Sequence, residues 1–310
     1  MSPKKYRLVT RSDFDGLVCA VLLNELELID EIKFVHPKDM QDGLIAIGSS
    51  DITTNLPYVP GAYLAFDHHS SETVRNAKAR TNHIILPDAP SAARVVYDYY
   101  GGKQLFARIS DDMMSAVDKA DSAQFSRDEI LDPTDWVLLN YLMDARTGLG
   151  RFRDFRISNY ALMMDLIGFC RDHSIEQILA LPDVQERVEL YFEHAEYAKE
   201  QIQRCTTVHR NLAVLDLRGE EKIFATNRFM IYALFPQTNI SIHVMWGLHQ
   251  QNTVFATGKS ILDRSSKTNV GALMLNYGGG GHHAAGTCQV GNDEASSTLS
   301  ALIKRINKDG

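Results

Sequence analysis

The alternation of short apolar runs with helical patterns in the first hundred residues constrains the fold more than any other feature. Tyr6–Thr10 has the length of a strand, and apolar residues recur at helical spacing in Gly16–Leu28. The other strand-length runs are Glu31–Val35, Leu44–Ile47, Ala62–Phe66 and His83–Leu86. Ala89–Tyr100 is typical of a helix, which Gly101 ends. This alternation predicts an α/β domain in which helices cover a mostly parallel sheet.

The rest of the chain predicts a mainly helical stretch, a long helix and a smaller second α/β domain. Residues 105 to 180 are mainly helical in pattern, and a run without Pro or Gly extends from Val184 to about Val208. This run fits either a helix inside a domain or a connector, and the connector is favoured because strand-like runs return just after it. We therefore expect a first domain at residues 1–182, a helical connector at 183–208 and a second domain at 209–310.

Composition narrows the class of protein. With 45% hydrophobic and 23% charged residues, the chain is typical of a globular protein. No apolar stretch approaches the roughly 18 residues of a membrane span, and the first residues lack the layout of a secretory signal, so we expect a cytoplasmic protein without a membrane partner. The net charge of -7 argues against stable binding of duplex DNA. The four scattered cysteines favour small buried side chains over a zinc site, and the sequence leaves a homodimer open.

Two acidic residues directly follow the first predicted strand. Asp13 and Asp15 lie two positions apart, between Arg11 and Gly16, so both side chains can point to the same face of an extended segment. Ligands of open parallel sheets bind at the carboxyl ends of the strands. The pair is therefore a candidate site, although such a pattern is also common in turns and helix caps.

Further acidic and histidine side chains follow other predicted elements. They are Asp67-His68-His69 directly after the run Ala62–Phe66, Asp51 a few residues after the run Leu44–Ile47, and Asp118 and Asp121 three apart on a predicted helix. Taken singly, each pattern also fits a turn, a cap of a helix that starts near Ser71, or a solvated surface. Taken together, the carboxylates would converge at one edge of the sheet and repel one another unless a cation neutralised them. The sequence therefore predicts a site for Mn²⁺ or a similar cation.

These motifs, in this order and at these spacings, resemble the DHH phosphoesterase superfamily. The C-terminal run from Tyr277 to His282, with four glycines, resembles the hallmark of the DHH-associated substrate-binding domain. The resemblance spans nearly the whole chain and is strongest to a bacterial subgroup labelled exopolyphosphatase-related, near the nanoRNases. It implies an N-terminal parallel-sheet catalytic domain, a smaller C-terminal α/β substrate-binding domain and a helical linker between them.

The resemblance also implies roles for individual residues. Asp13 and Asp51 would bind one metal ion, and the second ion would be bound by Asp15, Asp51, His68 and Asp121. Asp67 would orient a ligand, and His69 would contact the scissile phosphate or help the leaving group depart. The implied cofactor is Mn²⁺, as one or two ions, with Mg²⁺ or Co²⁺ as alternatives.

The first metal position departs from the pattern of the relatives. Many of them carry a histidine two or four residues before the first aspartate, where this chain has Arg11 and Val9. The ion at Asp13 therefore lacks a usual ligand, and His36 is one candidate to replace it. Arg11 could instead bind a substrate phosphate.

The C-terminal glycines predict a phosphate site. Gly278–Gly281 could adopt unusual backbone angles, so that successive N–H groups form a nest for an anion, although a flexible loop fits the run as well. Relatives place an arginine at the distance of Arg264 upstream. The expected substrate-binding residues are Arg264, Gly279, Gly280, His282 and Arg11. A second basic segment, Arg146–Arg156, mixes arginine with phenylalanine and fits either single-stranded nucleic acid or a solvated helix start.

These expectations combine into a phosphoester hydrolase that uses metal-activated water on short oligonucleotides or related nucleotides. A phosphatase acting on polyphosphate or adenosine bisphosphate is the alternative enzyme. A nucleotide sensor without catalysis is the alternative of another class, because the first metal position lacks a usual ligand.

Overall fold

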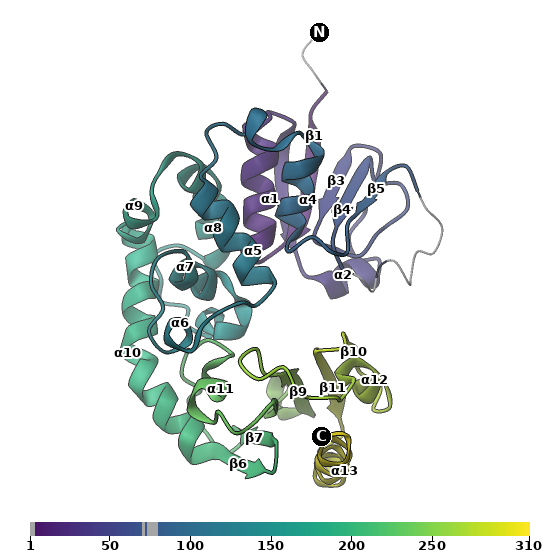
Figure 1. Cartoon of the computed structure of the whole chain (residues 1–310), viewed down its shortest axis with the longest axis vertical. Coiled ribbons are helices and arrows are strands. Elements are labelled where there is room, and N and C mark those ends of the chain that lie inside the picture. The colour runs from purple at the N-terminus through teal and green to yellow at the C-terminus, as the bar shows by residue number, and fades with distance from the viewer. Residues whose placement is uncertain (1–3, 70–71, 73–79) are drawn as a thin grey trace. The chain divides into compact units, whose positions relative to one another are not determined.

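The computed structural model describes residues 4–69, 72 and 80–310, which divide into two compact units. Unit 1 comprises Met1–Gln124 and Pro133–Leu190, and unit 2 comprises Phe125–Asp132 and Tyr191–Gly310. The chain is α/β, with one sheet in each unit (Figure 1). A helix start near Ser71 lies outside the described residues.

Unit 1 is built on a parallel sheet with the order β2-β1-β3-β4-β5. Its strands are β1 (Tyr6–Arg11), β2 (Ile29–Val35), β3 (Asp51–Thr54), β4 (Leu64–Asp67) and β5 (His83–Ile85). The chain runs from β1 to β2 on one side and then to β3 on the other side of β1. The topological switch point, where parallel sheets bind ligands, therefore lies between β1 and β3.

Helices supply the rest of unit 1. They are α1 (Phe14–Glu25), α2 (Pro37–Gln41), α4 (Ala92–Tyr99), α5 (Asp111–Asp121), α7 (Asp135–Met143), α8 (Asn159–Asp172), α9 (Ile175–Leu179) and short 3₁₀ turns at Gly102–Gln104, Ala145–Thr147 and Leu149–Arg151. Helix α1 is buried along Phe14 to Leu23 and contacts α4, α5 and α8, which group beside β1 in Figure 1. Because it is covered on several sides, its apolar residues extend around most of its circumference.

Unit 2 carries a mixed sheet with the order β10-β11-β9-β8-β7-β6. Its elements are α6 (Arg127–Leu131), β6 (Thr206–His209), β7 (Leu212–Asp216), α11 (Met230–Leu234), β8 (Ile240–Trp246), a 3₁₀ turn (Leu248–Gln250), β9 (Thr253–Lys259), α12 (Val270–Leu275), β10 (Gly280–Gly281), β11 (Ala285–Val290) and α13 (Ala295–Asp309). Apolar residues of the sheet, such as Ile242 and Phe255, form one core cluster with Met274 of α12 and Leu302 of α13. The two units divide inside the long helix α10 (Pro182–Cys205). None of the described helices is both long and apolar enough to span a membrane.

The expected elements are found with one consequential error. Leu44–Ile47 was predicted to be a strand, but it is irregular chain, and β3 begins only at Asp51. Leu44 is exposed, whereas Ile45 and Ile47 pack against a small apolar cluster that includes Val9. An apolar run of strand length therefore packs here without joining the sheet. The short strands β6 and β10 and the placement of α6 in unit 2 were not expected either.

Candidate active site

The junction of β1 and α1 places the first two carboxylates. Asp13 is the N-cap of α1, and its Oδ1 accepts a hydrogen bond from the Gly16 amide at 3.0 Å. Asp15, only 2% exposed, accepts from the amides of Ala92 (3.0 Å) and Ala93 (2.8 Å) at the start of α4. A Cβ at position 16 would lie 1.9 Å from the Arg11 carbonyl oxygen, so this tight turn from strand to helix requires glycine.

The segment Asp67-His68-His69 leaves the carboxyl end of β4 with both imidazole rings oriented. Asp67 Oδ1 accepts from the His68 amide (2.9 Å) and from His69 Nδ1 (2.7 Å). His68 Nδ1 lies 3.0 Å from the Ala89 carbonyl oxygen, which can only accept, so Nδ1 carries the proton. His68 Nε2 is therefore the nitrogen that can coordinate a metal.

Asp121 completes the cluster from the last turn of α5. Its Oδ2 lies 2.8 Å from His68 Nε2. Asp118, the other acidic residue of the expected pair, instead accepts from Ser91 Oγ (2.7 Å) and Arg94 Nε (2.9 Å) and fastens α5 to α4. Asp118 therefore positions Asp121 without joining the cluster.

Asp15, His68 and Asp121 offer ligand atoms that all lie within 4.8 Å of one another. Burial, and then the charge of Asp121, raise the pKa of Asp15 to about 8. Burial lowers the pKa of His68, but the bond to Asp121 and the nearby charges outweigh it and raise this pKa to about 9. Both shifts mean that the cluster favours bound protons. The proton of His68 that faces Asp121 lies where a cation would fit. Two carboxylates and one imidazole suit a divalent cation.

Asp13 lies beside this cluster but has a different partner. Its Oδ2 is 2.8 Å from Arg11 Nε, and its Oδ1 also accepts from Asn55 Nδ2 at 3.3 Å. Burial raises the pKa of Asp13, and the charge of Arg11 opposes this shift. Asn55 follows β3 directly, is 1% exposed and has a positive φ of 54°, which asparagine tolerates better than most residues.

The structure does not bring Asp51 to the cluster. Asp51 begins β3 and is in register with Arg7, near the start of β1, whereas Asp13 comes two residues after β1 ends. At about 3.3 Å per residue, the four residues of β3 put it roughly 10 Å from the carboxyl end of the sheet. Its carboxylate binds Arg7 Nε (2.8 Å) and the Gly48 amide (2.6 Å). The expectation that Asp51 bridges two metals is wrong, because β3 was placed several residues too early.

His36 does not lie with the cluster either. It is the N-cap of α2, and its Nδ1 accepts from the Lys38 amide at 3.2 Å. Asn55, in contrast, lies at the site but was not among the residues expected from the sequence. The misplaced strand explains this omission. Asn55 lies at the switch point only when the strand is placed at Asp51–Thr54, directly before it.

The basic segment Arg146–Arg156 packs within unit 1. Arg156 Nη2 lies 2.6 Å from Asp183 Oδ2, and the ring of Phe155 stacks on the fully buried guanidinium of Arg187 at 4.1 Å. Arg146 binds Asp144 at 2.7 Å. These contacts favour the structural interpretation of the segment over binding of single-stranded nucleic acid.

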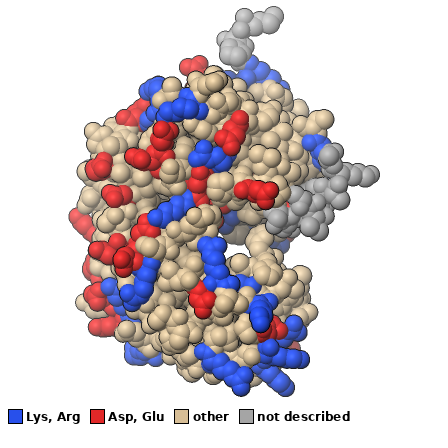
Figure 2. Space-filling model, in the orientation of Figure 1, with Lys and Arg blue, Asp and Glu red and all other residues tan. Residues whose placement is uncertain are grey.

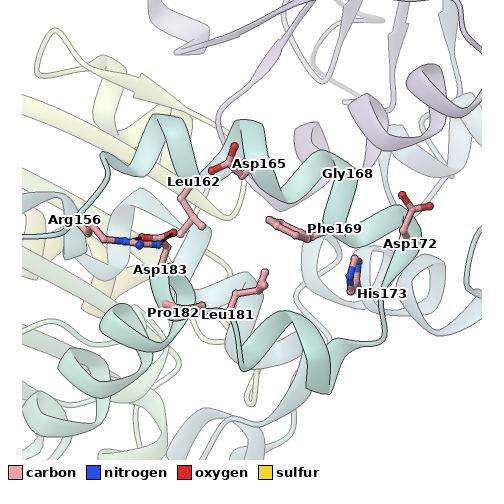
Figure 3. A pocket seen from close by; sticks show the side chains of 10 residues that line it. All are labelled: Arg156, Leu162, Asp165, Gly168, Phe169, Asp172, His173, Leu181, Pro182 and Asp183. Atoms are coloured by element: carbon pink, nitrogen blue, oxygen red, sulfur yellow. Dashed lines mark hydrogen bonds and ion pairs between the residues drawn. The ribbon is translucent and has the colours of Figure 1, made fainter.

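A pocket of about 560 Å³ lies in unit 1, lined by α8 and the start of α10. Figure 3 shows the ion pair of Arg156 and Asp183 at one end and Phe169 and His173 at the other. None of the cluster residues Asp15, His68 and Asp121 lines it. Figure 2 shows Lys and Arg side chains interspersed with Asp and Glu on the face in view, without a continuous basic track there.

The glycine run of unit 2 does not form the expected nest. The amides of Gly278, Gly279 and His282 donate to backbone carbonyl oxygens, and Gly280 and Gly281 pair with β11. A Cβ on Gly279 would lie 2.1 Å from the Thr287 carbonyl oxygen, whereas nothing lies within 4 Å of a Cβ on Gly280. Close backbone packing therefore explains Gly279, and Gly280 faces open space.

Two of the expected substrate residues of unit 2, Arg264 and His282, lie at the same end of its sheet. Arg264 lies in the loop after β9, and His282 lies just before β11; both are exposed. Strand β9 ends beside the start of β11, where Gly258 pairs with Ala285. Both loops therefore start from neighbouring strands.

Comparison with known proteins identifies the class of protein to which this chain belongs. No family model and no curated protein matches the chain. Among solved structures, it is similar to the pGpG-specific phosphodiesterase PggH from Vibrio cholerae, with 65% identity and a TM-score of 0.86 over 99% of this chain and 100% of that one. An exopolyphosphatase-related protein from Bacteroides fragilis matches with 13% identity and a TM-score of 0.52 over 97% and 92% of the two chains. RecJ from Thermus thermophilus, in complex with Mn²⁺, matches with 12% identity and a TM-score of 0.54 over 98% of this chain and 52% of that one.

The two distant likenesses concern the fold alone, whereas the 65% identity covers the whole length of both chains. The chain belongs to the DHH phosphoesterase superfamily. It is an enzyme that hydrolyses phosphoesters.

Proposed function

We propose that this enzyme is a metal-dependent phosphodiesterase that hydrolyses short linear nucleotides of the pGpG type. The cluster of Asp15, His68 and Asp121 carries the metal part of the proposal, because its ligand atoms lie within 4.8 Å of one another. The substrate class is supported by 65% identity to the pGpG-specific phosphodiesterase. Mn²⁺ is the ion we propose, with Mg²⁺ or Co²⁺ as alternatives.

A divalent cation bound there supplies a water of lowered pKa and neutralises charge on the phosphoryl oxygens. The protein orients the reaction around it. Asp15 is fixed by the amides of Ala92 and Ala93, and His68 is fixed by the Ala89 carbonyl. Ligands held in this way need little rearrangement when the cation binds.

We propose that His69 donates the proton to the leaving oxygen. The bond from His69 Nδ1 to Asp67 fixes the ring, and Nε2 is the ring nitrogen that we propose acts on the substrate. Burial lowers the pKa of His69, but the bond to Asp67 and the charge of Asp67 outweigh burial and raise this pKa above the usual value, which favours the protonated ring.

The proposed binding residues of unit 2 are Arg264 and His282, on loops next to neighbouring strands, and Gly280, on β10. Arg264 can contact a phosphate through two N–H groups at once. Gly280 lets a ligand approach the backbone, because nothing lies within 4 Å of its missing Cβ. Binding energy from a second nucleotide would then position the scissile bond.

Hydrolysis of pGpG in Mn²⁺ by the wild type, D15N and H68N tests the proposal. We expect turnover by the wild type and its loss in both variants, because each removes a metal ligand. Longer oligonucleotides, adenosine bisphosphate and polyphosphate in parallel measure specificity. Turnover of polyphosphate alone, or binding of pGpG with no product in Mn²⁺, would contradict the proposal and favour a phosphatase or a sensor, respectively.

A further inference from the structure

The carboxylate of Asp13 and the guanidinium of Arg11 lie where a second metal ion would need protein ligands. We propose that the site holds one divalent cation, and that Arg11 takes the place of a second one, anchored by Asp13, which also accepts from Asn55. This inference rests on the metal-dependent function proposed above. It assigns Asp13 to an arginine anchor and not to the metal-binding residues.

Asp13 already has a donor on each carboxylate oxygen. Arg11 Nε lies 2.8 Å from Oδ2, and Oδ1 accepts from Gly16 (3.0 Å) and Asn55 (3.3 Å). Asp15 also accepts two hydrogen bonds, but these come from neutral backbone amides. The charge of Asp13 is therefore balanced by a permanent cation, whereas the charge of Asp15 is not.

Asn55 places a neutral side chain directly after β3, at the carboxyl end of the sheet where the switch point lies. A carboxylate there could bridge two cations, but an amide cannot balance their charge. Asp51, the nearest acidic residue on the same strand, lies four positions earlier and is bound to Arg7. Among the described residues, this end of β3 thus provides a donor to Asp13 and no bridging carboxylate.

The charges around the cluster balance with one divalent ion. Asp13, Asp15 and Asp121 contribute three negative charges, and Arg11 contributes one positive charge. The neighbouring carboxylates have partners of their own, because Asp67 accepts from His69 Nδ1 and Asp144 is paired with Arg146. With His68 neutral as a ligand, the balance is two negative charges, which one divalent cation neutralises. A second one would leave an excess of positive charge in a largely buried site.

The chemistry of Arg11 suits this role. A guanidinium stays charged at every relevant pH and offers five N–H donors. The bond to Asp13 uses only part of them, and the Arg11 side chain keeps 28% exposure. Arg11 can therefore contact phosphoryl oxygens of a substrate while Asp13 holds it in place.

Calorimetric titration of the full chain with Mn²⁺, after removal of bound metal, tests the inference. We expect one Mn²⁺ per chain in the wild type. D13N should still bind one Mn²⁺, weakened only several-fold by the loss of a nearby negative charge, because Asn keeps the N-cap acceptor and no metal ligand is removed. D15N is the matched variant two positions away and should weaken binding beyond the roughly 10–100-fold that the loss of an outer partner causes.

R11Q provides a second test, which depends on whether the affinity for Mn²⁺ rises or falls. Removing a positive charge beside the metal should tighten Mn²⁺ binding several-fold, while R11K should stay close to the wild type. Circular dichroism confirms that each variant is folded. Two Mn²⁺ per chain in the wild type, a D13N defect as large as that of D15N, or weaker Mn²⁺ binding by R11Q would each overturn the inference. Two ions would leave the proposed function standing, whereas no binding at all by the wild type would refute its metal dependence.

Discussion

Asp51 shows at the scale of one residue how position along a strand decides the role of a carboxylate. Its bonds to Arg7 and to the Gly48 amide are part-buried, so D51N should lower the free energy of unfolding by about 1–3 kcal/mol. Mn²⁺ binding should stay within about threefold of the wild type, because Asp51 lies far from the cluster. Chemical denaturation and calorimetry measure the two effects. A stable D51N protein that no longer binds Mn²⁺ would contradict the placement.

His69 and Asp67 should affect turnover without affecting metal binding. H69N removes the proposed proton donor, and we expect kcat to fall roughly 10²- to 10⁴-fold. D67N keeps an acceptor for His69 Nδ1 but removes its charge, so a smaller decrease of about tenfold is expected. Steady-state kinetics on pGpG, with Mn²⁺ titrations as control, separate the effects. A loss of Mn²⁺ binding in H69N would make that residue a ligand instead.

At the scale of elements, the sequence could predict most of the first sheet, because its pattern of apolar runs and helices is regular. The position of β3 could not be predicted, because Leu44–Ile47 and Asp51–Thr54 both have strand length. Only pairing with β1 selects the second run, in which the hydroxyl of Thr54 donates to Thr10 Oγ1 at 2.7 Å. That error moved Asp51 into the expected site and left Asn55 out.

The sequence predicted a phosphate nest from the backbone freedom of the glycine run. In the structure, close backbone packing explains most of these glycines. G279A and G280A form a matched pair for this distinction. G279A places a Cβ 2.6 Å from the Cβ of Cys288 and should cost roughly 1–3 kcal/mol of stability. G280A meets nothing within 4 Å, so its stability should be unchanged while KM for pGpG rises. Thermal denaturation and kinetics test the pair, and equal destabilisation by both would contradict this assignment.

The end of α10 is fastened to the turn after β7 by an ion pair that responds to acid. The bonds to Arg204, and then to Gln201, lower the pKa of Glu220 from 4.5 to about 2. Because this pKa is lowered in the folded state, its stabilisation is present above pH 4.5 and is lost as the pH falls towards 2. E220Q should therefore show a shallower loss of stability between these values. Denaturation at several pH values measures this loss. An equal loss of stability in the wild type and E220Q between pH 4.5 and 2 would contradict this role.

At the scale of the whole molecule, contacts divide the chain inside α10, after Leu190, and assign one earlier segment to unit 2. Residues 125–132, placed in the first domain from the sequence, contact unit 2, where Asn227 Nδ2 donates to the Ile130 carbonyl oxygen at 2.9 Å. No local pattern could show this, because the bond joins residues 97 positions apart. We still propose 1–182 and 209–310 as the two domains, with 183–208 as their connector.

The two units provide a way to locate the metal by stability. Each contains one of the two tryptophans, Trp136 in unit 1 and Trp246 in unit 2. Asp15, His68 and Asp121 all belong to unit 1. Mn²⁺ at about 100 times its dissociation constant should stabilise that unit by about 2.7 kcal/mol, a rise in Tm of roughly 5–10 °C.

Fluorescence of W246F and W136F reports the units separately, because each variant keeps one tryptophan. We expect Mn²⁺ to raise the transition seen by Trp136 and to leave the transition seen by Trp246 nearly unchanged. D15N in the same backgrounds is the control and should show no shift at either tryptophan. Equal shifts at both tryptophans would mean that the units unfold together, and a shift confined to Trp246 would place the metal outside the cluster of Asp15, His68 and Asp121.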